Sequence, residues 1–331
     1  MILLTLIFIF VALVLYVLLG GADFGAGIIE IFTGKRGINT ISKAIAPVWE
    51  ANHIWLIVVI VILFNAFPKV YSTVALYLHI PIFLVLIGII FRGTAFTFRY
   101  YDPYPDKSHR YFTLAFKIFS VFTPLFLGIT LGAIILGDMT VLETADFSQK
   151  FIFPWLNFFT FSLGIFLILL FAYLAAVYLT GEPLKPEEKK IYYTYTIRLI
   201  IALIIAGGIV FLTAHLYHLH LLQLYINSPV GITCLVIATL IIPLIAISLK
   251  KEKYLLSRIL AGIQTASIIA GWFLTQYPVI VSIQNNMSLT INNSIAPQNT
   301  LVLLNLALTF GLLIVIPLLF YLFRTFKLKS E

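Results

Sequence analysis

Residues 2–27 read ILLTLIFIFVALVLYVLLGGADFGAG, an apolar run that ends in a glycine-rich segment holding one acid, Asp23. An apolar stretch of about 18 residues or more is long enough for an α-helix to cross a bilayer. No basic segment precedes this run and no small-residue cleavage site follows it, so we expect a retained helix rather than a signal peptide. Apolar residues continue past the glycines to Phe32. The first helix is therefore expected to be long, kinked or tilted.

The composition of the whole chain agrees with this interpretation. Of the 331 residues, 61% are hydrophobic and 10% are charged, whereas a soluble domain carries about 25% charge. A chain this apolar cannot bury its hydrophobic surface in one aqueous core, and a bilayer is its natural solvent. Its single cysteine, Cys234, excludes an internal disulfide and is expected to be a buried small hydrophobe.

Nine apolar segments of spanning character follow one another along the sequence. They predict an all-α integral membrane protein with about nine transmembrane helices, forming one polytopic domain over residues 1–331. The second is expected to begin near Pro47 and the eighth near Leu255, because their apolar cores alone are short. The segments are Ile2–Gly20, Ile54–Ala66, Val74–Phe91, Tyr111–Leu136, Pro154–Leu179, Thr194–Leu216, Pro229–Leu249, Ile259–Leu274 and Leu301–Phe323.

Basic residues are concentrated in every second loop. Eighteen of the 21 basic residues fall in the odd-numbered loops and the tail, whereas the even-numbered loops hold only Lys69 and Lys150. The remaining one, Arg92, is expected at the end of the third span. By the positive-inside rule, this predicts the N-terminus outside and the C-terminus in the cytoplasm. The formal charge of +8 is then a topology signal and an attraction to anionic lipid, so no nucleic-acid partner is expected.

A few ionisable residues fall within or beside the spans, where they are costly and usually functional or paired. Asp23, Glu50, Arg92 and, less centrally, Glu30 are the members of this group. The alternation of the spans puts Asp23, Glu50 and Arg92 at a similar level near the cytoplasmic side. Two interpretations stay open: a structural ion cluster that ties three helices together, and an entry path for protons or ions.

The start of the second span is dense in polar and aromatic side chains, PVWEANHIW over residues 47–55. Glu50 and His53 are three residues apart and are expected to share a helix face. A carboxylate beside an imidazole is suited to proton transfer. Trp49 and Trp55 are also typical of the membrane interface.

The other histidines give weaker signals. His215, His218 and His220 cluster at the outer end of the sixth span, where we interpret them as interfacial polar residues rather than a metal site. His79 lies two residues before Pro81 and could in principle bind haem iron. We interpret it instead as a histidine satisfied by its surroundings, and we expect no haem and no metal bound by this chain.

Four motifs in the first third of the chain together resemble subunit II of cytochrome bd ubiquinol oxidase. They occur in the order and spacing of that family, and the span count and orientation agree with it along the whole length. The motifs are GADFGAG at 21–27, PVWEANHIWL at 47–56, FNAFP at 64–68 and RGTAFTFR at 92–99.

The resemblance implies an electrogenic terminal oxidase that oxidises quinol and reduces dioxygen to water, in a bacterial or archaeal cytoplasmic membrane. Haems b and d are expected in the partner, subunit I, and some members also hold a structural quinone. Two four-helix bundles and a peripheral helix are implied, here over about 1–137, 154–275 and 300–324. Further expected partners are quinol, lipid and a small single-helix accessory subunit.

The resemblance carries a role in the cytoplasmic proton path, or in its support, to Asp23, Glu50 and Arg92. Where some members have Gly and Glu after the acid at position 50, this chain has Ala51 and His53. A carboxylate relay through position 53 is thereby lost, and His53 is a candidate substitute. Two alternatives from other classes are a proton- or ion-coupled secondary transporter and a non-catalytic membrane scaffold.

The loop charges generate a topology prediction. Reporter fusions after Lys190 and Lys253 should report the cytoplasm, and a fusion near Asn286 should report the exterior. A cytoplasmic signal at Asn286 would mean that the number of spans is miscounted.

Overall fold

A computed structural model describes residues 1–102, 108–140, 142, 144–182, 186–284 and 288–326. Within these residues, nine helices are long and apolar enough to cross a membrane. The predicted all-α membrane fold and the count of nine are confirmed. The spans are Ile2–Thr33, Trp49–Ala66, His79–Tyr101, Ser108–Leu136, Phe158–Leu179, Glu187–Leu216, Pro229–Lys250, Tyr254–Gln276 and Gln298–Leu322.

The first span is continuous but not uniform. It consists of α1 (Ile2–Leu15), a π-helical turn η1 (Tyr16–Gly20) and α2 (Gly21–Thr33). A π-turn holds one more residue than an α-turn, so it changes the direction in which all later side chains point. At Gly34 the backbone takes a positive φ of 59° and the chain turns into α3 (Lys35–Ile45).

The second span begins at Trp49, close to the predicted start, as α4 (Trp49–Asn52) followed by α5 (Ile54–Ala66). The third was expected over Val74–Phe91, but the helix breaks into α6 (Pro68–Tyr77) and α7 (His79–Tyr101). Pro81 has no N–H to bond the carbonyl four residues earlier, so it is better tolerated in the first turn of a new helix.

Arg92 was expected to close the third span. Instead α7 continues to Tyr101, and Arg92 lies in the interior of the helix and of the protein, with 1% of its surface exposed. Hydropathy finds the apolar part of a span, whereas the helix itself runs on into the polar zone. The sixth helix shows the same effect, because it begins at Pro186 and not at Thr194.

The remaining elements complete the chain. They are α8 (Ser108–Leu136), α9 (Phe147–Phe151), α10 (Phe158–Leu179), α11 (Pro186–Leu216), α12 (Leu221–Asn227), α13 (Pro229–Lys250), α14 (Tyr254–Gln276), the antiparallel strands β1 (Val279–Ser282) and β2 (Ser288–Thr290), α15 (Ile291–Ser294) and α16 (Gln298–Phe326).

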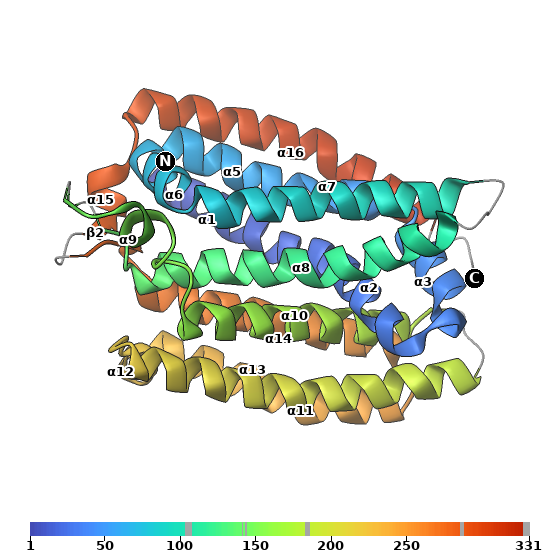
Figure 1. The fold of residues 1–331 in the computed structure, drawn as a ribbon. Coiled ribbons are helices and arrows are strands. Elements are labelled where there is room, and N and C mark those ends of the chain that lie inside the picture. Colours follow the sequence, from blue (N-terminus) through green and yellow to red (C-terminus); the bar gives the residue numbers. More distant parts are fainter. Residues whose placement is uncertain (103–107, 141, 143, 183–185, 285–287, 327–331) are drawn as a thin grey trace.

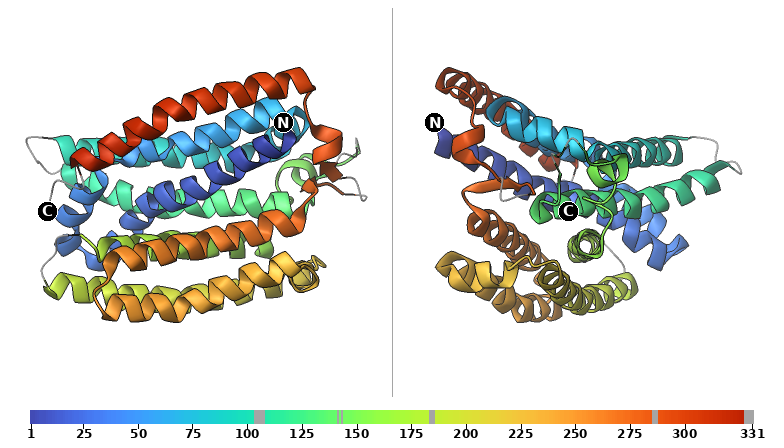
Figure 2. Two further views of the ribbon diagram at one scale, coloured as in Figure 1. Left: turned by 180° about the vertical axis from the view of Figure 1, so that it is seen from behind. Right: turned by 60° about the vertical axis from the view of Figure 1, so that its left-hand side comes forward.

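The long helices lie roughly along one axis (Figures 1 and 2). Helices α2, α7, α8 and α10 form a packed centre, α11, α13 and α14 lie on one side of it, and α16 packs on α1 and α5. The short elements α9, α12 and α15 lie at the same end as the N-terminus, and α3 lies at the other end (Figure 1). The loops thus lie alternately at the two ends of the bundle, as the charge pattern requires. Which end faces the cytoplasm stays a prediction. Asn286, the site of the proposed outer reporter fusion, lies outside the described residues.

Helices α2 and α10 approach each other closely at a glycine. A Cβ built on Gly25 would lie 1.8 Å from the backbone oxygen of Phe171. Gly128 and Gly164 bring α8 and α10 together in the same way, since a Cβ on Gly128 would lie 2.6 Å from the Cα of Gly164. Small residues at such crossings let helix backbones pack closely where no hydrophobic effect drives them together.

We predict that Gly25→Ala destabilises the protein by at least about 1–3 kcal/mol, because the backbone of α10 cannot yield as a side chain would. Gly208→Ala in α11 is the control, since a Cβ there meets nothing within 4 Å. The midpoint of heat unfolding in detergent should fall for Gly25→Ala and stay level or rise for Gly208→Ala. Equal midpoints would show that the close crossing is not needed.

Candidate functional site

Asp23 and Arg92 form a buried ion pair between α2 and α7. Arg92 Nη1 lies 3.7 Å from Asp23 Oδ2, and Arg92 Nη2 donates a hydrogen bond of 2.7 Å to the backbone oxygen of Asp23. Arg92 Nε donates to Ser120 Oγ of α8 at 3.2 Å. The guanidinium carbon also lies 4.7 Å from the ring centre of Phe24. The sequence placed these two residues at one level, and the structure brings them into contact.

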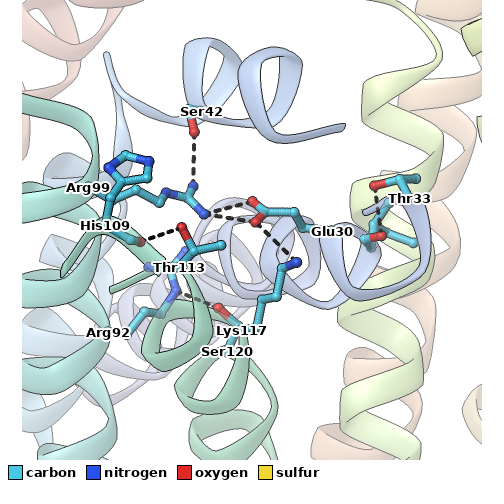
Figure 3. A network of polar contacts seen from close by, with 10 residues as sticks. Glu30, Thr33, Ser42, Arg92, Arg99, His109, Thr113, Lys117 and Ser120 are labelled. Atoms are coloured by element: carbon cyan, nitrogen blue, oxygen red, sulfur yellow. Dashed lines mark hydrogen bonds and ion pairs between the residues drawn. The ribbon is translucent and has the colours of Figure 1, made fainter. Parts of the chain in front are cut away.

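A second buried ion pair joins the same two helices (Figure 3). Arg99 Nη1 donates to both carboxylate oxygens of Glu30, at 2.8 and 2.9 Å, and Nη2 donates to Ser42 Oγ of α3 at 2.9 Å. Lys117 Nζ of α8 lies 3.7 Å from Glu30 Oε1. Glu30 is fully buried. Sequence reasoning missed this pair because it counted Arg99 and Lys117 as loop cations.

The two pairs share one spacing along the chain, although Arg99 bonds both carboxylate oxygens of its acid and Arg92 bonds a backbone oxygen. In each pair the acid and the arginine are 69 residues apart. The two acids are therefore seven residues apart in α2, and the two arginines are seven residues apart in α7. Seven residues are about two turns of a helix, so the equal spacing was the signal that could have revealed the second pair. The ring of Phe116 from α8 lies 5.0 Å from the Arg92 guanidinium and 4.2 Å from that of Arg99. We call Asp23–Arg92 and Glu30–Arg99 the double ion pair.

Glu50 and His53 differ in their surroundings. The chain tightens at this point, with His53 N donating to Glu50 O at 3.3 Å, three residues back. Glu50 is exposed on the surface of the chain. The His53 ring turns inward, 5.5 Å from the ring of Phe24 and 6.2 Å from that of Tyr16.

Two buried polar atoms close to Asp23 stand out in the described part of the chain. His53 Nδ1 and the Tyr16 hydroxyl are buried without a hydrogen-bond partner there. Such groups are costly unless a water or another polar group satisfies them. Tyr16 begins the π-turn that leads to Asp23, and π-turns occur often at functional sites. Asp23, Arg92, His53 and Tyr16 thus define a polar site near the middle of the first span.

An apolar cavity of about 300 Å³ lies between α8, α10, α11, α13 and α14. Histidine and methionine are common axial ligands of haem iron, and neither is found among the described residues that line it. The lining does include Cys234 and Tyr225, and cysteine and tyrosine serve as axial ligands in some haem proteins. His79 is exposed at the start of α7, with Nδ1 2.8 Å from the Leu76 carbonyl oxygen, and does not face it.

The fold and the site define a class: a polytopic helical membrane protein with a core tied by buried charges. The same fold occurs in the structure of bd oxidase from Geobacillus thermodenitrificans, with a TM-score of 0.78 over 98% of this chain and 99% of that one, at 19% identity. The sequence model of the family described as cytochrome bd terminal oxidase subunit II matches residues 1–326. This chain belongs to that family.

Individual relatives match over shorter segments. Cytochrome bd ubiquinol oxidase subunit 2 of Bacillus subtilis is 37% identical over 83 residues, 24% of this chain and 25% of that protein. Cytochrome bd-I ubiquinol oxidase subunit 2 of Escherichia coli is 32% identical over 91 residues, 27% of this chain and 24% of that protein. In these matches the chain spans about a quarter of each relative's length.

The contacts of Glu30 predict that its two cationic partners, Arg99 and Lys117, contribute unequally to the stability of the protein. Arg99→Met leaves the buried Glu30 carboxylate without its strongest partner and should destabilise the protein by roughly 3–5 kcal/mol. Lys117→Met removes a longer contact of 3.7 Å made by a side chain that is 21% exposed, so its cost should be smaller, about 1 kcal/mol. Heat unfolding in detergent measures both. Equal losses in the two variants would contradict the bidentate assignment.

Proposed function

We propose that this chain is the second subunit of an electrogenic quinol:oxygen oxidoreductase in a bacterial or archaeal cytoplasmic membrane. It would support a haem-bearing subunit I and contribute to the path by which cytoplasmic protons reach the site of oxygen reduction. Family membership over residues 1–326 supports this proposal most strongly. It favours the oxidase over a secondary transporter, for which the comparisons give no support.

The redox groups are proposed to lie in the partner. Haems b and d supply the electron transfer and oxygen chemistry when bound there. A structural quinone, which some family members hold, would find hydrocarbon-like walls in the apolar cavity of this chain. Quinol, lipid and a small single-helix accessory subunit complete the proposed partners.

The proton path is argued from burial and position. Reduction of oxygen consumes protons, and a hydrocarbon interior does not conduct them without polar stations. Glu50 is exposed, whereas Asp23 is 4% exposed and lies inside. His53 is turned inward from the same short segment as Glu50, with a buried Nδ1. An exposed acid, an inward imidazole and a buried acid form a sequence of groups that can each exchange a proton.

Arg92 is proposed as support for this path and not as a station. A guanidinium keeps its proton at all ordinary pH values, so Arg92 can fix the position of Asp23 without carrying the transferred proton. Its bond to the Asp23 backbone oxygen holds α2 whatever the protonation state of the carboxyl group. A scaffold role alone would also use this bond, and the substitutions below separate the two.

We predict that Asp23→Asn lowers quinol-oxidase turnover of the purified complex roughly tenfold or more and that Glu50→Gln lowers it about twofold, because neither amide can carry a proton. Haem content and assembly should stay near normal for Glu50→Gln, since its side chain is exposed. The control is Glu187→Gln, another exposed acid, at the start of α11.

Full turnover in intact Glu50→Gln complexes would show that Glu50 is not an obligatory station. Full turnover in intact Asp23→Asn complexes would remove the proton path from this chain. Failure of Glu50→Gln to assemble would instead indicate a structural role for that acid.

A further inference from the structure

A second, smaller cavity touches Asp23, and Glu50 is not among the described residues that line it. Its volume is about 110 Å³, and it lies between α2, α3, α4 and the end of α10. Most of its wall is apolar, but four polar side chains line it: Asp23, Asn52, Tyr178 and Glu182. Two carboxylates on the wall of one small cavity between membrane helices are costly, and such placement usually reflects a function.

The two carboxylates differ in their access to water. The Asp23 side chain is 2% exposed, whereas that of Glu182 is 18% exposed. Glu182 follows the last residue of α10 by three positions, at the end of the span. On the same wall, Ala175 and Tyr178 precede it by seven and four residues, about two turns and one turn of helix. The cavity therefore joins a water-accessible acid to a buried one along the last turns of α10.

Glu182 is fixed at this position by contacts from α14. Arg258 Nη2 donates to Glu182 Oε1 at 3.1 Å and to the Tyr178 backbone oxygen at 2.6 Å. The Arg258 guanidinium packs directly over Gly181, since a Cβ there would lie 2.7 Å from it. The arrangement ties the end of α10 to α14 and holds the Glu182 carboxylate on the cavity wall.

The cavity is large enough for water. One water needs roughly 10–15 Å³ of such volume and two to four polar partners. A volume of about 110 Å³ with an amide, a phenol and two carboxylates meets both conditions for several waters. A chain of hydrogen-bonded waters passes protons between groups too far apart to touch.

We infer that Glu182, the cavity and Asp23 form a proton entry route within this chain, separate from the Glu50 surface. A proton from bulk water binds the Glu182 carboxylate, leaves it for the cavity waters and reaches Asp23; no other reactant is needed. The inference rests on the proposed function for the use of these protons. It names Glu182, which the sequence motifs do not include, as the entry group.

The presence of water in the cavity is tested by thiol labelling, which does not depend on oxidase activity. The chain has one cysteine, so Cys234→Ser gives a clean background for Ala175→Cys and Ala176→Cys. These neighbours are 2% and 0% exposed, but only Ala175 is on the described cavity wall. Methanethiosulfonate ethylammonium, followed by intact mass, should label Ala175→Cys at least about tenfold faster, because the reagent attacks thiolates in water. Equal, slow labelling of both would overturn the route.

The entry role is tested in the purified oxidase complex. Glu182→Gln keeps a hydrogen-bond acceptor for Arg258 but cannot bind a proton, and should lower turnover about twofold. The loss should grow from pH 6 to pH 8, as protons become scarce, and Glu182→Asp should restore most of it. Glu187→Gln is the matched control and should behave as the parent at each pH.

The outcomes separate the inference from the proposed function. Normal turnover of Glu182→Gln beside impaired Asp23→Asn would overturn the route through Glu182 and leave the proposed function in place. Normal turnover of Asp23→Asn would overturn both. A loss in Glu182→Gln that is the same at every pH, or that Glu182→Asp does not restore, would mark Glu182 as structural and overturn its role as the entry group.

Discussion

Charges buried among membrane helices must be paired, and here two pairs hold the centre of the fold. Removing ions from water costs several kcal/mol each, and only close partners with further hydrogen bonds offset that cost. The double ion pair supplies both, because Ser120, Ser42 and the Asp23 backbone oxygen complete the arginine contacts. Helices α2 and α7 consequently have one register in which all charges are satisfied. A slip by one turn of either helix would leave four ions unpaired.

This register also fixes the neighbours. Helix α8 inserts Phe116 between the two guanidinium groups, so its position follows from that of α7. Helix α3 is tied to α7 by the bond from Arg99 to Ser42, which places α3 across the end of the bundle. Since the small cavity is walled by α2, α3, α4 and α10, its shape depends on charges that do not line it, such as Arg99 and Glu30. The structural roles and the proposed proton-carrying roles are therefore linked through the packing of these helices.

The sequence predicts the membrane fold well because hydropathy and loop charge are properties of whole segments. It placed Asp23 and Arg92 at one level, but not Arg92 inside its helix, because apolar length does not show where a helix ends. Glu30 and Arg99 were weak signals for the same reason, and only the equal spacing of seven residues distinguishes them. Glu182 carries no signal of this kind: its place on a cavity wall depends on the packing of α10 against α2 and on Arg258 from a distant helix.

The π-turn at Tyr16–Gly20 accommodates one more residue than a regular α-helical turn would. Each residue in an α-helix turns the next side chain by about 100°. If the same residues were wound as an uninterrupted α-helix, the part beyond them would be rotated by about 100° and would present a different side to its neighbours. Asp23 and Glu30 would then both rotate away from their arginines at once. The winding of this short segment thus determines which side of the helix carries the acids.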